Sequence, residues 1–546
     1  MAVKNRAHQR IVFHDYETEN LDSKVKQGAA KPVEYAAVEV DENLNELPDG
    51  RHHKIISPSS DVIGNPYAYL VHGIDTDMAR KVGMSEFEFI EWLGQLYQKG
   101  PNTVISGFNT MNFDDEVTRH SRFRNLLPAY KPEFENGNFR FDIFKVVQLA
   151  YAMAPDILEW AKKADGSDSL KLTDLTAANG IDHLDAHSAL SDVDATISLA
   201  KLIKERKPDL WHYALWLTDK KNINSMLRED GILLSTNTVY GQASKYTKAI
   251  YPLIIDPKNP NKMLCVDMNS PDLNMLFEHS PEKLNKLLFT SKLDLGADAM
   301  DVPLLDVTAN KMPLAIPATN RVLEAKQDAF KLDIDIINKN MEKIRGNQEQ
   351  LKKIVQETYT SDMGPGPSSS AHKLYFLPGF PTPQTSRLMS EQHREGDDGK
   401  VKLRTANIAA LAAKTDTPDL YYDLALQAKY RTWMSECFSD PTTSPAEIVD
   451  FADYLVEKLE KGIDETYTFD QFDTDMLAIS KERVLSPKEK KVLEALSGRT
   501  DDQRAMVENL KIMSEELRPA AEKEKKNSQH YRLIKGGPRN PVGPGM

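Results

Sequence analysis

The first 206 residues alternate strand-like and helix-like patterns, and this alternation limits the fold more than any other feature of the chain. We expect strands over residues 11–18, 33–40 and 103–107, where short apolar or alternating runs occur. Residues 188–204 repeat apolar residues at helical spacing and predict an amphipathic helix. Strands that alternate with helices are typical of an α/β domain.

Two acidic residues, Asp15 and Glu17, end the first expected strand. Side chains alternate along a strand, so both carboxylates project from the same face, which they share with Ile11 and Phe13. Two carboxylates on one face repel each other unless a cation lies between them, and Mg²⁺ prefers such oxygen ligands. The chain has 82 acidic residues, so the Asp-x-Glu pair alone does not decide the function.

Two further patterns follow the same order along the chain. Asp114 comes directly after Phe113, and His187 stands five residues before Asp192 at the start of the expected helix. Taken singly, such acids are common in the first turn of a helix, where the helix dipole favours them. Taken together with Asp15 and Glu17, they resemble the DEDD exonuclease signature in its histidine-containing form. That resemblance implies a ribonuclease-H-like fold.

Longer motifs extend the resemblance to the exodeoxyribonuclease I family. The matching segments are FHDYET, FDDEVTR, LTAANGI, AHSALSDVDAT, SKLDLG and PLIIDPKNPN, which fall within residues 10–345. LALQAKYR is a partial match, and the resemblance ends after about residue 480. It implies an α/β exonuclease domain, a small SH3-like β-barrel and an α-helical C-terminal domain, which together form a C-shaped clamp around single-stranded DNA.

The domain limits come from breaks in this pattern. Pro208 marks the end of the α/β region, and the β-branched and aromatic segments at 235–268, broken by DPKNPNK, predict a small all-β unit. The predicted limits are 1–206 for the exonuclease domain, 207–345 for the SH3-like domain, 346–480 for the helical domain and 481–546 for an extension. We interpret the mildly basic extension as helical and solvated, with a disordered end, GGPRNPVGPGM.

The resemblance also implies a role for each site residue. Asp15, Glu17 and Asp192 would bind one Mg²⁺ ion, Asp15 and Asp114 would hold a second, and Mn²⁺ could substitute. His187 would act as the general base toward water, since its unperturbed pKa of about 6.5 is near working pH. The products would be 5′-mononucleotides.

Four residues are predicted to contact the substrate: Glu17, Thr18 through its backbone, Arg119 and Lys171. Lys171 departs from the family, which has arginine there, so the charge is kept but the bidentate fork is lost. The resemblance excludes several neighbours of the site residues. Asp194, for example, lies about 200° around the helix from Asp192. The other excluded residues are His14, Asp115, Glu116 and His183.

Composition limits the partners and the setting of the protein. The net charge of −13 counts against nucleic acid, because phosphate contacts need Lys and Arg, although a locally basic groove can coexist with an acidic exterior. Two distant cysteines, Cys265 and Cys437, argue against a disulfide framework and fit a cytoplasmic protein. We find no apolar run of about 18 residues and no signal peptide, so we expect no membrane contact. The expected partners are single-stranded DNA and single-strand DNA-binding protein, and we expect a monomer.

The carboxylate pattern leaves other functions open. An exoribonuclease or a proofreading-type exonuclease of the same histidine-containing class would have the same site. A non-catalytic single-strand-binding protein with a relic site, or a scaffold, is a more distant alternative.

Overall fold

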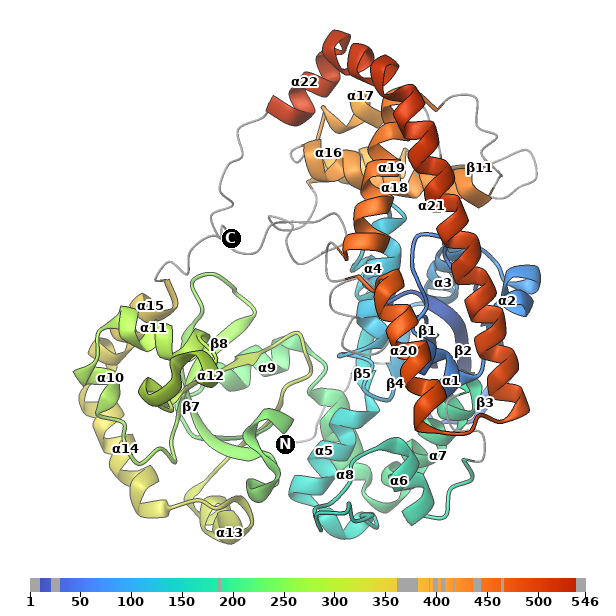
Figure 1. Ribbon diagram of the computed structural model, residues 1–546. Coiled ribbons are helices and arrows are strands. Elements are labelled where there is room, and N and C mark those ends of the chain that lie inside the picture. Colours follow the sequence, from blue (N-terminus) through green and yellow to red (C-terminus); the bar gives the residue numbers. More distant parts are fainter. Residues whose placement is uncertain are drawn as a thin grey trace.

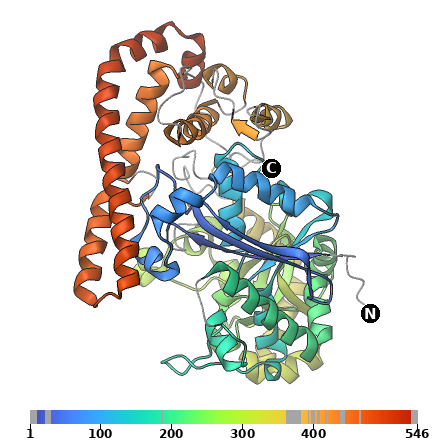
Figure 2. The same cartoon turned by 90° about the vertical axis from the view of Figure 1, so that its right-hand side faces the viewer.

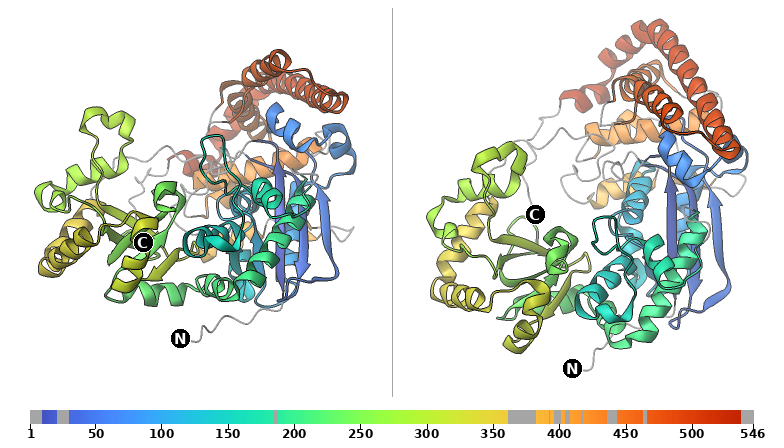
Figure 3. Two further views of the ribbon diagram at one scale, coloured as in Figure 1. Left: turned by 90° about the horizontal axis from the view of Figure 1, so that it is seen from below. Right: turned by 60° about the horizontal axis from the view of Figure 1, so that its bottom comes forward.

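The computed structural model describes residues 10–20, 30–183, 188–360, 382–391, 393–395, 401–403, 408–415, 418–435, 443–462 and 466–536. The chain forms a first α/β unit, a β unit and a C-terminal helical unit, and the last two lie on different sides of the first (Figures 1 and 3). None of the described helices has the length and apolar character needed to cross a bilayer.

A five-stranded sheet in the order β3-β2-β1-β4-β5 forms the centre of the first unit. The central strand β1 pairs antiparallel with β2 and parallel with β4, and β2 pairs antiparallel with β3. The three expected strands are confirmed as β1, β2 and β4. The strands of this sheet are β1 (Ile11–Thr18), β2 (Pro32–Val40), β3 (Glu46–Ile55), β4 (Val104–Gly107) and β5 (Phe139–Asp142).

Helices cover both faces of this sheet. On β1, Ile11 and Phe13 pack into the core formed with α5, α7 and α8, whereas Val12 and Tyr16 pack against α3 and α4. The alternation of the strand therefore directs its odd-numbered side chains toward α7, the helix predicted at 188–204. The helices of this unit are α1 (Pro66–His72), α2 (Thr76–Val82), α3 (Glu86–Gln98), α4 (Asp114–Arg124), α5 (Ile143–Met153), α6 (Leu172–Ala178), α7 (Ala189–Arg206) and α8 (Pro208–Trp216).

The β unit is a five-stranded antiparallel sheet in the order β10-β6-β7-β8-β9. The core under α5 and α7 continues into this unit through residues of β6, β7 and β8. Its strands are β6 (Leu233–Thr236), β7 (Thr247–Ile255), β8 (Lys262–Asp267), β9 (Leu304–Thr308) and β10 (Leu314–Pro317). Its helices are α9 (Lys220–Arg228), α10 (Met275–Glu278), α11 (Pro281–Phe289), α12 (Lys292–Leu295), α13 (Asn320–Phe330), α14 (Ile334–Gly346) and α15 (Gln348–Thr360).

The C-terminal unit is mostly helical, as the sequence predicts, with one short hairpin. Its long helix α21 runs beside α19 and along α1 and α2 of the first unit (Figure 2). The elements are α16 (Pro383–Ser390), β11 (His393–Glu395), β12 (Val401–Leu403), α17 (Ile408–Ala412), α18 (Pro418–Ser435), α19 (Pro445–Lys461), α20 (Phe469–Glu482), α21 (Pro487–Asn527) and α22 (Gln529–Gly536).

The interpretation of the extension as solvated is wrong for α21, because this helix is anchored in the first unit. Arg499 is fully buried, and its guanidinium donates to Glu19 Oε2 (2.5 Å) and to the backbone oxygens of Ser59 (2.6 Å) and Val62 (2.9 Å). Its other amino group lies 3.2 Å from the hydroxyl of Tyr69. The last residues of the chain, GGPRNPVGPGM, lie beyond the described residues apart from Gly536.

Candidate active site

Strand β1 carries Asp15 and Glu17 on the face that α7 covers. All other residues of the strand are buried, whereas these two carboxylates are partly exposed. β4 pairs with β1 only as far as Phe13, so the end of β1 that carries the acids extends past its parallel neighbour. The strand therefore presents two charged side chains at an open end of the sheet.

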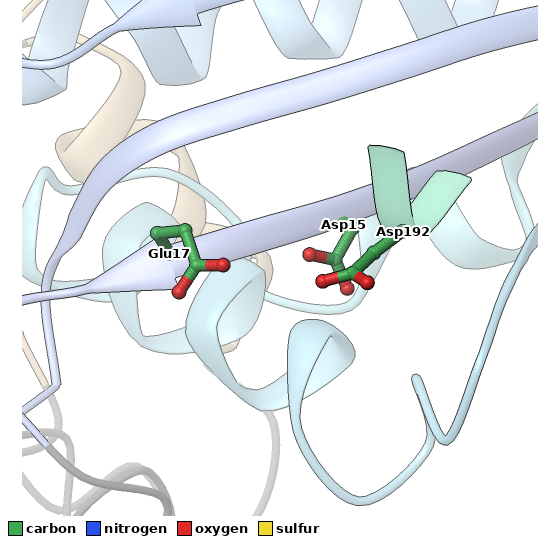
Figure 4. A group of neighbouring side chains, drawn as sticks. All are labelled: Asp15, Glu17 and Asp192. Carbon is green, nitrogen blue, oxygen red and sulfur yellow. The ribbon is translucent and has the colours of Figure 1, made fainter. Parts of the chain in front are cut away.

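Helix α7 brings a third carboxylate to this end. Asp192 is in its first turn, where its N–H donates to the carbonyl of Ser188 (3.0 Å), while Val193 is buried on the inner face of the helix. Asp15, Glu17 and Asp192 each offer one oxygen, and these atoms lie within 4.8 Å of one another (Figure 4). Three hard oxygen donors at this spacing match the ligands that Mg²⁺ or Mn²⁺ takes in proteins, so the residues fit a divalent cation.

Asp114 lies next to this group without belonging to it, as far as the described residues show. It is the first residue of α4 and is buried, and its Oδ1 accepts the N–H of Tyr16 at 3.2 Å. Burial raises the pKa of Asp114 well above its usual range, and the nearby carboxylates of Asp115 and Asp142 add to the effect. A buried carboxyl among other acids is best stabilised as an ion by a cation.

His187, the predicted general base, lies outside the described residues. The described residues end at His183 and resume at Ser188.

His183, which the motif spacing excluded, contacts the site directly. Its Nε2 lies 2.5 Å from Oδ1 of Asp192, and its Nδ1 lies 3.2 Å from Oγ1 of Thr176 on α6. The sequence signal for His183 was weak, because it stands nine positions before Asp192 and no fixed spacing links the two.

A second residue missed by the sequence analysis is Glu34, which faces Glu17 across the β1–β2 pair. One of its carboxylate oxygens accepts from the N–H of Ala189, the first residue of α7 (3.4 Å), and the other lies 2.6 Å from Nε2 of His53. An acid at a helix N-terminus stabilises the helix. Glu34 therefore links the start of α7 to the strand beside β1.

The predicted substrate contacts have different surroundings. Thr18 is buried at the end of β1, and its hydroxyl donates to the carbonyl of Asn20 (2.6 Å). Lys171 is exposed and directly precedes α6.

Arg119, the fourth predicted substrate contact, has its guanidinium turned inward. It is 5% exposed, and it donates through Nε (2.5 Å) and Nη2 (2.8 Å) to Glu133 and through Nη1 (2.7 Å) to Glu116. It also stacks over the ring of Tyr130. A contact with substrate would have to break a buried ion pair, so these contacts favour a structural role.

Comparisons with known proteins agree with this geometry. Residues 12–200 match a family described as Exonuclease, and residues 218–361 match the Exonuclease I SH3-like domain. Exodeoxyribonuclease I of Escherichia coli strain K12 is 32% identical over 349 residues, which are 63% of this chain and 71% of that protein. Exodeoxyribonuclease I of Haemophilus influenzae is 31% identical, over 63% of this chain and 71% of that protein.

Solved structures extend the likeness to the helical C-terminal unit. An Exonuclease I from Methylocaldum szegediense has a TM-score of 0.77 and 26% identity, covering 91% of this chain and all of that chain. The zinc-bound form of an E. coli Exonuclease I complex with single-stranded DNA has a TM-score of 0.75 and 26% identity, with the same coverage.

Proposed function

Because the chain belongs to the exodeoxyribonuclease I family, and is thus a nuclease, we propose that it degrades single-stranded DNA from the 3′ end to 5′-mononucleotides. The observation that carries this proposal is the convergence of Asp15, Glu17 and Asp192 from β1 and α7. The relatives crystallised with single-stranded DNA support the choice of substrate. Single-stranded RNA is the second candidate substrate, since a carboxylate site of this kind serves both chemistries.

We assign the metal ligands as the sequence predicted them. Asp15, Glu17 and Asp192 would hold one Mg²⁺ ion, and Asp15 and Asp114 a second, with Mn²⁺ as a substitute. When bound, such ions neutralise the charge that develops on the phosphodiester and promote attack by water. The surroundings of Asp114 support its assignment, because burial and the neighbouring carboxylates of Asp115 and Asp142 raise its pKa, and a bound cation would stabilise its ionised form.

The remaining proposed roles are activation of the attacking water and contact with the DNA strand. His187 would take a proton from the attacking water, as the family resemblance implies. The backbone at Thr18 and the exposed ammonium group of Lys171 would contact the terminal nucleotides. Arg119 remains a predicted substrate contact, and it would have to exchange its ion pairs with Glu116 and Glu133 for the strand.

The β unit and the C-terminal helical unit would hold the DNA strand. We propose that the β unit and the C-terminal helices keep DNA bound between successive cuts, and that the enzyme works as a cytoplasmic monomer in DNA repair or recombination. Single-strand DNA-binding protein remains a predicted partner. The domain limits 1–206, 207–345, 346–480 and 481–546 also remain predictions.

The test compares three substrates that share one sequence. Purified full-length protein with Mg²⁺ is given 5′-labelled single-stranded DNA, the same sequence as blunt duplex DNA, and the same sequence as RNA. Rapid shortening of the single-stranded DNA alone supports the proposal, and preferential shortening of RNA replaces it with the exoribonuclease alternative.

A second experiment tests retention of the strand. Excess unlabelled strand is added after digestion has begun, and the product lengths show how many nucleotides are removed per encounter. Products shortened by only a few nucleotides under this trap would contradict the proposed retention of the strand.

A further inference from the structure

His183 is placed to act on the metal site through one of the proposed ligands. Its side chain is 4% exposed, and its Nε2 contacts Oδ1 of Asp192 at 2.5 Å. An ionised carboxylate can only accept hydrogen bonds, so the ring donates to it through Nε2.

The ring is also fixed from its other side. Nδ1 lies 3.2 Å from the hydroxyl of Thr176, a fully buried residue of α6. The turn that follows α6 is closed by the N–H of Ile181, which donates to the carbonyl of Thr176 (2.9 Å). His183 therefore connects α6 to α7, and both ring nitrogens are used in doing so.

Asp192 needs such support because three carboxylates meet at the end of β1. Asp192 is 17% exposed and lies at the start of a helix, opposite Asp15 and Glu17, whose charges repel its own. A donor on one oxygen keeps the carboxylate from turning away from Asp15 and Glu17. Hydrogen bonds to metal-binding carboxylates tune affinity in this way, and their loss costs about 10–100-fold in metal affinity or activity.

We propose that His183 is a positioning residue that orients Asp192 for binding the divalent cation. The inference rests on the proposed function, because it assumes that Asp192 is a metal ligand. The proposed roles of His183 and His187 predict different effects. Loss of the general base His187 should lower kcat at every metal concentration, whereas loss of His183 should raise the metal concentration that the enzyme requires.

The experiment measures Mn²⁺ binding to the full-length protein by electron paramagnetic resonance, together with kcat as a function of Mg²⁺ concentration. His183→Ala should weaken Mn²⁺ binding by about 10–100-fold, and kcat should recover largely at high Mg²⁺. His183→Gln retains an N–H donor of similar reach and should restore most of the affinity. His212→Ala, which removes an exposed histidine from α8 of the same unit, is the matched control and should bind Mn²⁺ as the wild type does.

Thr176→Val covers the case in which His183→Ala fails to fold. It keeps the size of the side chain, removes the partner of Nδ1, and should weaken Mn²⁺ binding by a smaller factor than His183→Ala. Wild-type Mn²⁺ binding in a folded His183→Ala protein overturns the inference, as does wild-type binding in Thr176→Val if His183→Ala is unfolded. Asp192→Ala tests the proposed metal site independently of His183, because it should abolish Mn²⁺ binding. If Asp192→Ala binds Mn²⁺ normally, the proposed metal site itself is wrong.

Discussion

The N–H of Tyr16, the residue between Asp15 and Glu17, donates to Oδ1 of Asp114 at 3.2 Å. Strand β4 ends its pairing with β1 at Phe13, so this N–H has no strand partner on that side. The first residue of α4 takes the place of the missing strand. The third predicted acid is thereby tied to the backbone that carries the first two.

Asp114→Asn should leave the protein folded and abolish nuclease activity. Asparagine keeps an oxygen for the N–H of Tyr16 but removes the charge. The raised pKa of Asp114 means that ionising it in the folded state costs stability as pH rises through that pKa. In EDTA at pH 8, the unfolding temperature of Asp114→Asn should thus equal or exceed that of the wild type. Asp114→Ala also leaves the N–H unpaired and should lose about 1–3 kcal/mol. A less stable Asp114→Asn protein in EDTA would contradict this account.

Lys171→Ala should weaken capture of single-stranded DNA in a salt-dependent manner. Each phosphate contact contributes a slope of about −0.7 to the dependence of log affinity on log salt concentration, so the slope should become shallower by about that amount. Lys171→Arg should retain the slope, and Lys221→Ala, on the exposed surface of α9, is the control. All slopes are measured in proteins that also carry Asp15→Ala, so that the DNA is not cleaved during the binding measurement. An unchanged slope in Lys171→Ala would show that Lys171 does not contact the phosphates of the strand.

Arg499→Met should destabilise the protein by about 3–5 kcal/mol, because it leaves the buried carboxylate of Glu19 without its ion pair. Adding Glu19→Gln should recover part of the loss. Arg518, on the same helix, pairs with Asp453 at 2.7 Å, but the two side chains are 45% and 52% exposed. Arg518→Ala should therefore cost only about 0–1 kcal/mol. Denaturant unfolding gives these values, and equal losses for both arginines would show that α21 is not anchored at Arg499.

The pH dependence of stability should report on His393, in the short hairpin of the C-terminal unit. Burial lowers the pKa of its ring to about 4, with Glu91, Arg122 and the ring of Phe87 facing it. Between about pH 6.5 and 4 the unfolded chain takes up a proton at this residue and the folded chain does not, so stability falls as pH falls. The loss from this residue is roughly 3 kcal/mol at most. Burial raises the pKa of Glu91, which acts in the opposite direction.

The test of this effect is the difference between the wild type and His393→Gln. The unfolding free energy of the variant should fall less between pH 6.5 and 4. Parallel curves for the two proteins would show that His393 is not buried in its neutral form.

The sequence predicted those parts of the structure that depend on local patterns. The strand with Asp15 and Glu17 and the helix with Asp192 follow from periodicities of two and 3.6, and the structure has both. The helical nature of the segment after 481 was also predicted correctly, but its burial was not. Arg499 and its partner Glu19 are 480 residues apart, and no local pattern can relate them.

The site was predictable only where a fixed spacing exists. His183 reaches Asp192 because the turn after α6 folds back onto α7, which is a tertiary arrangement. Arg119 was assigned to substrate from its motif, whereas its environment depends on Glu133, which lies in a separate short helix. Sequence motifs identify the kind of residue, and the direction in which the side chain points is decided by its packing.

The central claim is that the carboxylates of β1 and α7 form the metal-dependent nuclease site. The most direct measurement is the shortening of 5′-labelled single-stranded DNA by full-length wild type, Asp192→Ala and Asp194→Ala, in Mg²⁺ and in EDTA. Asp194 is two residues further along α7, where its side chain is about half exposed and pairs with Arg51, so its variant is the matched control. We expect stepwise loss of nucleotides from the 3′ end by wild type and Asp194→Ala in Mg²⁺, and none by folded Asp192→Ala or by any of the three in EDTA. Shortening by Asp192→Ala at the wild-type rate would contradict the account.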